Sequence, residues 1–251
     1  MNLNGKVALV TGGAHRLGKV IALALAQAGA DVVIHFGRSA EQAQSTKAEI
    51  EAIGVKAITL SANLADPGEI EVLFAAVEAQ MGHLNVLVNS AASFQSQAFE
   101  EVTVDDWDRV LAVNLRAPFL CSQHAARLMR KGKEQGLIVN LIDLSGVYPW
   151  KDHVQHGVSK AGLRHLTKIA ARSLAPHVRV NALTLGAILP PAGVSAESPG
   201  WKNLEASLPL QRAVDPQEVG RVVVSLAEST FITGAEVLLT GGEHLLGPVN
   251  H

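Results

Sequence analysis

The feature that most constrains this chain is an apolar run near its start that leads directly into a glycine-rich turn. Residues 6–11 read KVALVT, a pattern typical of a buried strand, and the turn occupies residues 12–18. Gly12 and Gly13 would allow positive φ and close approach of the backbone, and Gly18 would let a following helix pack tightly. The N-terminus of that helix would direct free N–H groups and a partial positive charge at an anion. The stretch therefore predicts a phosphate cradle.

Three interpretations of this turn remain open from its residues alone. The general dinucleotide fingerprint G-x-G-x-x-G is not literally present, because five residues separate Gly12 from Gly18. Residues 13–19 fit the first seven places of the P-loop pattern, but Val20 stands where that pattern needs a hydroxyl for Mg²⁺. The third interpretation is a strand–helix turn without a ligand. A position on the first strand of a regularly alternating chain favours dinucleotide binding.

Apolar runs alternate with helical stretches along the chain. Strands are expected at residues 6–11, 31–36, 55–60, 84–88, 137–142, 178–183 and 236–239, and helices at 20–28, 39–53, 66–81, 105–131, 152–174 and 216–228. Residues 189–209 are proline-rich and show no clear period. This alternation predicts an α/β protein, a single-domain doubly wound Rossmann fold with a parallel seven-stranded sheet and helices on both faces. Residues 1–251 would form one domain, with a substrate lid at about 187–209.

Composition limits the classes of partner. Hydrophobic residues make up 48% of the chain and charged residues 18%, with a net charge of −2, which argues against nucleic acid or an anionic membrane as the main partner. Cys121 is the single cysteine, and the chain opens with a strand instead of a signal peptide, so we expect a cytoplasmic protein. The ten histidines show no metal-ligand spacing, and we predict no metal site.

The end of the second strand indicates which nicotinamide cofactor would bind. In a doubly wound sheet the ligand lies at the carboxyl ends of the strands, and an acidic residue there would bind a ribose 2′-hydroxyl. Residues 36–39 contain no carboxylate, and Asp31 lies at the opposite end of the strand. Arg38, with Arg16 and His15 in the cradle, could instead bind a 2′-phosphate. The sequence therefore predicts NADP(H) over NAD(H).

Further landmarks extend over nearly the whole chain and resemble the short-chain dehydrogenase/reductase family. They are Thr11-Gly12 with Gly18, Asn63-Leu64-Ala65-Asp66, Val88-Asn89-Ser90-Ala91-Ala92, Asn114, Ser159-Lys160-Ala161, Val180-Asn181-Ala182 with Gly186, and Ile232-Thr233-Gly234 with Gly241-Gly242. Within the family, Arg16 in place of a usual glycine, the run HFGRSA at 35–40 and the run ASF at 92–94 are similar to the NADPH-dependent pteridine reductase branch.

The resemblance implies a set of site residues. The cofactor-binding residues would be Gly12, His15, Arg16, Leu17, Gly18, Arg38, Ser39, Asn63, Leu64, Asn89, Ser90, Ala91, Lys160 and Gly186. The catalytic residues would be Asn114, Asp143, His156 and Lys160, and the substrate would contact Phe94, Asp143 and Tyr148. The resemblance also implies a homodimer or homotetramer, paired through the helices at 105–131 and 152–174.

The catalytic stretch departs from the family pattern. The family places a Tyr four residues before the Lys and a Ser 13 residues before that Tyr, whereas this chain has His156 and Asp143 at those places. A neutral imidazole is a poor substitute for a phenol, so His156 would have to donate its proton as an imidazolium. The Lys160 cation would disfavour the imidazolium, and the Asp143 carboxylate would favour it and could make an Asp–His proton relay. Tyr148 is the single tyrosine and lies on the loop after the fifth strand.

Two functions follow from this departure, and a P-loop or other use of the fold stays open as a third. The first is an NADP(H)-dependent oxidoreductase that reduces a C=O or C=N bond of a small pterin-like or ketone substrate by hydride transfer. The alternative is a catalytically impaired NADP(H)-binding homologue that acts as a sensor or partner subunit. Turnover distinguishes the two.

Overall fold

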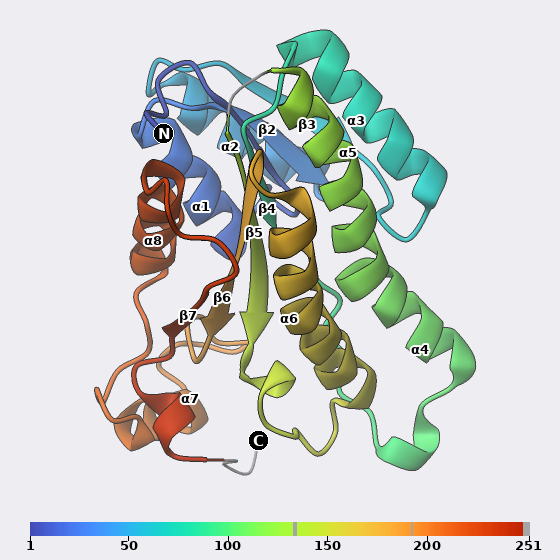
Figure 1. Cartoon of the computed structure of the whole chain (residues 1–251). Helices are drawn as coiled ribbons and strands as arrows, with labels where there is room; N and C mark the ends of the chain where they lie inside the picture. Colours follow the sequence, from blue (N-terminus) through green and yellow to red (C-terminus); the bar gives the residue numbers. More distant parts are fainter. Residues whose placement is uncertain (133–134, 192, 248–251) are drawn as a thin grey trace.

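The structure is a computed structural model that describes residues 1–132, 135–191 and 193–247. Seven parallel strands form one sheet in the order β3-β2-β1-β4-β5-β6-β7 (Figure 1). The strands are β1 (Val7–Val10), β2 (Asp31–Phe36), β3 (Ala57–Ser61), β4 (Val86–Asn89), β5 (Gly136–Asp143), β6 (Val178–Leu185) and β7 (Glu236–Leu239). The predicted doubly wound fold is confirmed. The order reverses between β1 and β4, which is where such sheets bind their ligands.

Helices cover both faces of the sheet (Figure 1). One face packs against α1 (Arg16–Gln27), α2 (Ala40–Glu51) and α8 (Pro216–Glu228), and the other against α3 (Pro67–Met81), α5 (Ala117–Lys131) and α6 (Val154–Leu174). Strand β1 shows why both faces are needed, because Ala8 and Val10 enter one core while Val7 and Leu9 enter the other. Side chains of a strand alternate between faces, so a run that is apolar throughout requires burial on both sides.

The helix predicted at 105–131 is not continuous. It divides into α4 (Val104–Leu111), a π-helical segment η2 (Ala112–Arg116) and α5, and the N–H of Ala117 donates to the carbonyl of Ala112, five residues earlier. Pro118 explains the interruption, since it has no N–H to donate to the carbonyl of Asn114. Apolar periodicity does not register such a change, so the prediction was wrong at this point. The π segment carries Asn114.

The proline-rich segment at 189–209 contains a helix that the sequence did not predict, α7 (Pro199–Ser207). Ser198 caps it by accepting a hydrogen bond from the N–H of Trp201 at 3.4 Å, and Pro199 opens its first turn. Trp201 is its single buried residue, so the helix has too few apolar positions to show a period.

The glycine turn has the tight geometry that was expected, with one difference. Gly12 adopts a φ of +65°, and a Cβ on Gly18 would lie 2.1 Å from the carbonyl oxygen of Gly12. Only glycine fits at position 18, because α1 begins against the turn. Gly13 does not need positive φ, whereas Arg16 adopts a φ of +50° in the left-handed region.

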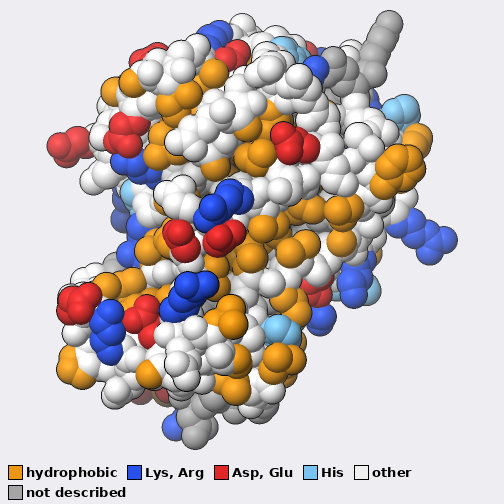
Figure 2. Space-filling model, turned by 90° about the vertical axis from the view of Figure 1, so that its left-hand side faces the viewer, with side chains coloured by type: hydrophobic (Ala, Val, Ile, Leu, Met, Phe, Trp, Pro, Cys, Tyr) orange, Lys and Arg blue, Asp and Glu red, His pale blue; other side chains and the backbone are white. Residues whose placement is uncertain are grey.

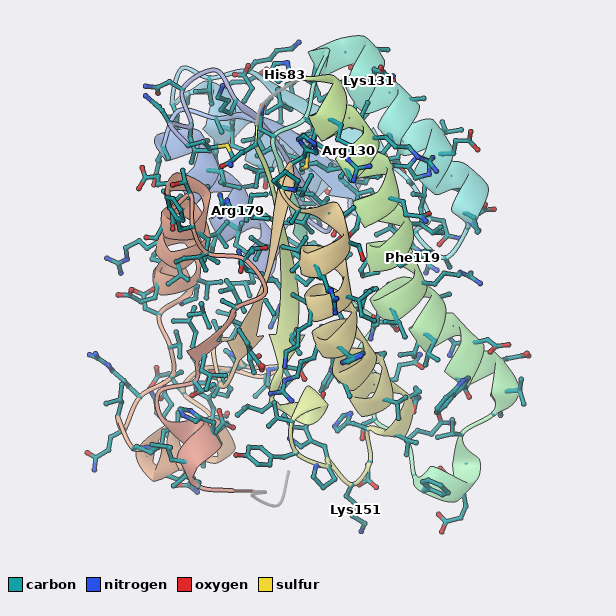
Figure 3. All side chains as sticks on the ribbon, in the orientation of Figure 1. His83, Phe119, Arg130, Lys131, Lys151 and Arg179 are labelled. Atoms are coloured by element: carbon teal, nitrogen blue, oxygen red, sulfur yellow. The ribbon has the colours of Figure 1, made fainter. Side chains whose placement is uncertain are left out.

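A buried cation closes the amino-terminal side of β6. Arg179, labelled in Figure 3, donates from its guanidinium to the carbonyls of Leu226 and Ala227 at the end of α8, at 2.8 and 3.2 Å. Burial lowers the pKa of this guanidinium, and the partial negative charge of the helix end offsets part of that cost. Helix α8 is thereby held on the sheet.

The surface carries mixed charge. Figure 2 shows Lys and Arg side chains interspersed with Asp and Glu on one face, together with scattered apolar side chains. Among the described residues, no helix combines the length and the apolar character needed to cross a membrane.

Candidate active site

A cluster of polar side chains lies at the carboxyl ends of β4 and β5 and the start of α6. Asp143 is the last residue of β5, and His156 and Lys160 lie in the first two turns of α6. His156 and Lys160 are four residues apart, so they lie on the same side of the helix, which faces the end of β5. Asn114 approaches from the π segment η2.

Asp143 and His156 are directly bonded. Nε2 of His156 lies 2.8 Å from Oδ2 of Asp143. The imidazole is 2% exposed and the carboxylate 22%, so the carboxylate is the member of the pair that other molecules can reach. The other carboxylate oxygen, Oδ1, accepts from the backbone N–H of Ser145 at 3.0 Å and from the Ser145 hydroxyl.

The second nitrogen of His156 faces both a donor and an acceptor. Nδ1 lies 3.3 Å from Nδ2 of Asn114 and 3.2 Å from the carbonyl oxygen of Ser93. In the neutral ring, Nδ1 can accept from Asn114 while Nε2–H donates to Asp143. In the imidazolium, Nδ1–H can donate to Ser93 while Nε2–H keeps its partner. The surroundings of the ring therefore satisfy both protonation states.

Asn114 fixes the loop that carries Ser93. Its side-chain oxygen accepts from the N–H of Ser93 at 2.7 Å, and its side-chain nitrogen lies 2.9 Å from the carbonyl of Ser93. The same nitrogen lies 3.1 Å from the hydroxyl of Ser159 on α6. Asn114 thus connects η2, α6 and the chain after β4 around His156.

Lys160 places a buried positive charge behind the carboxylate. Its Nζ donates to the carbonyl of Leu141 at 3.0 Å and lies 3.9 Å from Oδ2 of Asp143. Burial lowers the pKa of Lys160, and the Asp143 charge opposes this shift. Burial would raise the pKa of Asp143, but the His156 hydrogen bond and the Lys160 charge outweigh it and lower that pKa from 3.8 to about 2. Asp143 is therefore a carboxylate at neutral pH.

Aromatic side chains stand beside this cluster. The ring of Phe94 lies 4.6 Å from that of His153 and 4.8 Å from that of His156, and Trp150 lies 5.7 Å from His153. Phe94 is 57% exposed, so its ring offers an apolar face at the site. The hydroxyl of Tyr148 is already engaged in a hydrogen bond, which it donates to the carbonyl of His244 at 2.5 Å.

Apart from Lys160 on α6, the residues predicted to bind the cofactor lie along the carboxyl ends of β1 to β4 and of β6. His15, Arg16, Arg38 and Asn63 are exposed there. The remaining members are Gly12, Leu17 and Gly18 in the turn, Ser39 at the N-cap of α2, Leu64 after β3, Asn89, Ser90 and Ala91 at the end of β4, and Gly186 after β6.

Two of these residues make contacts that the sequence did not predict. Asn89 is buried, and its side-chain nitrogen donates to Oδ1 of Asn140 at 2.8 Å. Arg16 donates from Nη2 to the carbonyl of Pro190 at 2.7 Å, which joins the cradle to the predicted lid. The lid prediction spans 187–209, of which residue 192 lies outside the described residues.

Sequence reasoning missed two supporting residues. The hydroxyl of Thr11 accepts from the N–H groups of Ser90 and Ala91 at 2.9 and 3.1 Å, which joins the ends of β1 and β4. His35 binds the glycine turn from the end of β2. Each had a signal in the sequence, since both are polar residues within or at the end of an apolar strand.

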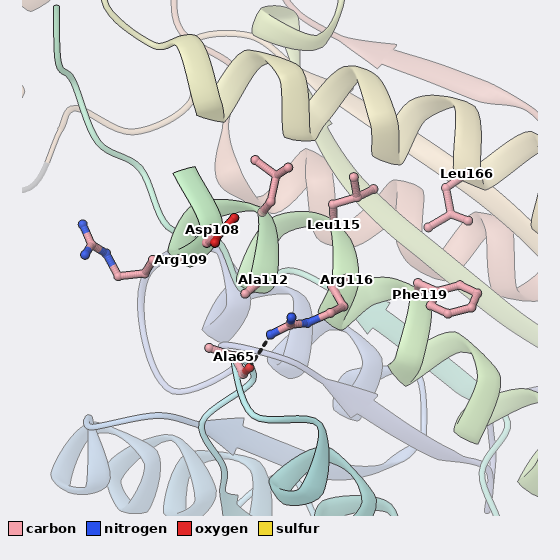
Figure 4. Close-up of a pocket in the computed structure, with 9 residues that line it drawn as sticks. Ala65, Asp108, Arg109, Ala112, Leu115, Arg116, Phe119 and Leu166 are labelled. Atoms are coloured by element: carbon pink, nitrogen blue, oxygen red, sulfur yellow. Dashed lines mark hydrogen bonds between the residues drawn. The ribbon is translucent and has the colours of Figure 1, made fainter. Parts of the chain in front are cut away.

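A separate cavity lies on the outer side of the helices, away from the Asp143, His156 and Lys160 cluster. It has a volume of about 670 Å³ and is lined mainly by α4, η2, α5 and Leu166 of α6, with Phe119 at its edge (Figure 4). Arg116 crosses its floor to donate to the carbonyl of Ala65 at 2.7 Å. None of the Asp143, His156 and Lys160 side chains lines it. Within the described residues, no group of three or more His, Cys, Asp or Glu side chains could hold a metal ion.

Known proteins resemble the chain over nearly its full length. A family model described as enoyl-(acyl carrier protein) reductase matches residues 12–244. The hydroxynaphthalene reductase-like protein Arp2 of Metarhizium robertsii is 35% identical over 263 residues, with 96% of each chain covered.

Two solved structures with NADP superpose closely. FolM alternative dihydrofolate reductase 1 from Brucella canis, complexed with NADP, has a TM-score of 0.89 at 32% identity, covering 98% of this chain and 96% of that one. A short chain dehydrogenase from Burkholderia cenocepacia, also in complex with NADP, has a TM-score of 0.90 at 32% identity, covering 97% and 100%.

Replacing Asp143 should reveal the stability that its low pKa implies. Its pKa falls from 3.8 to about 2 on folding, so the carboxylate contributes stability that is present above pH 4 and is lost as the pH falls toward 2. Asp143→Asn should therefore lower the free energy of unfolding by about 2 kcal/mol at pH 7, and the difference should narrow below about pH 4 and close only near or below pH 2. Urea unfolding of both proteins between pH 7 and pH 2 measures it. A difference that stays constant over this range would contradict the assignment.

Proposed function

Because the chain belongs to the short-chain dehydrogenase/reductase family, we propose that it is an NADPH-dependent oxidoreductase that reduces a C=O or C=N bond of a small substrate. The observation that carries the proposal is the bonded group of Asp143, His156 and Lys160 at the carboxyl end of β5. A carboxylate, an imidazole and a buried ammonium within contact distance can hold and transfer a proton. The group stands beside the strand ends that carry the glycine turn.

The residues of the turn fit NADP(H). Gly18 can be only glycine, since a side chain there would meet the carbonyl of Gly12, and this close approach is what a phosphate cradle requires. Arg16 and Arg38 are exposed at the ends of β1 and β2, and residues 36–39 hold no carboxylate to compete with a 2′-phosphate. Both structural relatives hold NADP. NADP(H) is the cofactor, and when bound it supplies the hydride.

His156 takes the place of the family's Tyr, and Asp143 that of its Ser. The imidazolium of His156 can hold a proton on each nitrogen, because Asp143 Oδ2 accepts from one and the carbonyl of Ser93 from the other. The imidazole is almost fully buried behind the carboxylate. The proton held at Nε2 therefore passes to the carboxylate of Asp143, which delivers it to the substrate atom next to the carbon that receives the hydride. Lys160 keeps Asp143 ionised before the transfer.

The substrate is a flat molecule with two fused rings. Phe94 offers an exposed ring face 4.8 Å from His156, and Trp150 extends the same aromatic group. Such surfaces bind planar rings by stacking. The names of the relatives refer to a hydroxynaphthalene and to dihydrofolate, whose reactive portions are fused bicyclic rings. This chemistry agrees with a pterin-like substrate or a bicyclic ketone, and with the similarity to pteridine reductases.

The observations do not favour the alternative of a nucleotide-binding protein without catalysis. A site that had lost its reaction would not need to keep a carboxylate, an imidazole and an ammonium in one bonded group. Burial of these groups carries a desolvation cost, which a purely structural role could avoid with apolar residues. Asp143, His156 and Lys160 nevertheless remain together.

Cofactor preference is the first test of this function. The protein should bind NADPH at least about tenfold more tightly than NADH, because an Arg–phosphate pair contributes about 1.4 kcal/mol or more. Arg38→Ala should remove most of this preference. Arg130→Ala, which removes another exposed cation at the far end of α5, serves as the control. Titration of the three proteins with both nucleotides decides the matter, and equal affinities in the native protein would refute the 2′-phosphate argument.

The dependence of turnover on pH is the second test. If His156 holds the proton as an imidazolium, kcat/KM should fall as the pH rises from 5 to 9. His156→Ala should lower kcat/KM by about 100-fold or more and flatten the profile. His156→Tyr should raise the rate near neutral pH, provided that the site accepts the larger ring. His165→Ala, on an exposed position of the same helix, is the control. Equal rates in the native and His156→Ala proteins would show that His156 takes no part.

The cavity of Figure 4 suggests how copies of the chain assemble. Phe119 is 42% exposed at its edge, and Leu115 and Leu166 line the same cavity, so an apolar patch lies between α5 and α6. We propose that a second copy covers this surface, giving a homodimer or a homotetramer. Light scattering at micromolar concentration should show an oligomer for the native protein and a smaller species for Phe119→Glu. A monomeric native protein would refute this arrangement.

A further inference from the structure

His35 is a buried imidazole that lies outside the catalytic group. It is the fifth residue of β2, and its side chain points toward the glycine turn. The residue is only 2% exposed, and the strand residues on either side of it are apolar. Burial of an imidazole among apolar residues is costly unless both nitrogens find partners. The bonds of this ring are therefore informative.

The ring joins two segments that lie far apart in the sequence. The N–H of Gly12 donates to Nδ1 of His35 at 3.1 Å, and Nε2 of the ring lies 3.0 Å from the carbonyl of Ala62. The backbone of His35 adds a third bond, because its carbonyl accepts from the N–H of Gly13 at 2.9 Å. One residue thus holds the start of the turn and the end of β3.

These bonds require the neutral ring in one tautomer. Gly12 presents an N–H, so Nδ1 must be the acceptor, and Ala62 presents a carbonyl, so Nε2 must carry the hydrogen. A proton on Nδ1 would oppose the N–H of Gly12 and break that bond. Burial lowers the pKa of His35, in keeping with a neutral ring in the folded protein.

Both ends of this connection belong to the cofactor region. Gly12 opens the cradle, and its carbonyl lies against Gly18 at the start of α1. Ala62 precedes Asn63 and Leu64, which were predicted to bind the cofactor. Because the N–H groups of Gly12 and Gly13 are both bonded to His35, the N–H groups further along the turn and at the start of α1 remain for phosphate.

We propose that His35 is a positioning residue for the cofactor: its imidazole holds the glycine turn at a fixed distance from the end of β3, so that one nucleotide can contact both. The proposal rests on NADP(H) binding as proposed above. His35 does not touch the reacting atoms, and it acts through the backbone of Gly12 and Ala62.

Two conservative substitutions separate the two bonds. In His35→Asn the amide oxygen can take the place of Nδ1 and accept from Gly12, while the bond to Ala62 is lost. In His35→Gln the amide nitrogen can take the place of Nε2 and donate to Ala62, while the bond from Gly12 is lost. His35→Phe keeps the ring volume and removes both bonds.

The matched control is Asn85→Leu. Asn85 is also buried, and its side-chain oxygen accepts from the N–H of Val7 at 3.0 Å, at the opposite end of β1. This variant tests whether the loss of any buried hydrogen bond to β1 weakens cofactor binding. The two readouts are the Kd for NADPH without substrate and the hydrogen-exchange rate of the Gly12 amide in the free protein.

We expect His35→Phe and His35→Gln to weaken NADPH binding about tenfold or more and to speed exchange at Gly12, as the loss of a buried hydrogen bond would. His35→Asn should also weaken NADPH binding, because it breaks the connection to the end of β3, but it should leave exchange at Gly12 near the native rate, and Asn85→Leu should leave the Kd unchanged. If His35→Phe fails to fold, the Asn and Gln proteins still decide, because each loses one of the two bonds.

Two results would overturn the inference. One is native affinity in the Gln or Phe protein, and the other is a loss of affinity in Asn85→Leu as large as in those variants. These outcomes refute the role of His35 while NADPH binding by the native protein stands. A native protein that binds no NADPH would refute the proposed function and, with it, the positioning role.

Discussion

Burial of the parallel sheet on both faces is the constraint that decides where the polar chemistry of this chain can lie. Helices cover both faces, so the strands are apolar along their length and polar side chains concentrate where strands end. Asp143 stands at the last position of β5, and Thr11 directly follows β1. Asn140, a polar residue within β5, is paired both with Asn89 at the end of β4 and with Thr167 on α6. The active-site region is therefore the carboxyl edge of the sheet.

Within that edge, the charges hold one another in place. Asp143 lies between the imidazole of His156 and the ammonium of Lys160, and these partners offset the cost of burying a carboxylate. The hydrogen bonds around His156 serve either protonation state of the ring, because Asn114 can donate to Nδ1 and Ser93 can accept from it. A site that tolerates both states can release and regain a proton without rearranging its side chains. That property is what a reductase needs from its proton donor.

The sequence was most informative where local chemistry decides the structure. The bounds of β2, β7 and α8 were predicted as found, because apolar runs and Asp-Pro helix starts are local signals. Asp143 and His156 could be paired because they take the places of the Ser and the Tyr in the family pattern, and the structure bonds them directly. The interruption of the helix at 105–131 was missed because periodicity does not register a single extra residue, although Pro118 was a signal. The contacts of His35 and Tyr148 link segments distant in sequence, so no local pattern could have named their partners, although a polar His35 within an apolar strand did mark that residue.

The central claim is that this chain transfers hydride to a substrate held beside Asp143 and His156. The most direct measurement uses NADPH carrying deuterium in place of the transferable hydrogen at C4 of the nicotinamide, with a panel of fused bicyclic ketones and dihydropterins. Mass spectrometry of the products then follows the label. The account predicts a product with one deuterium from the native protein, and no labelled product when Asp143 and His156 are both replaced by Ala. Binding of NADPH without label transfer to any member of the panel would contradict it.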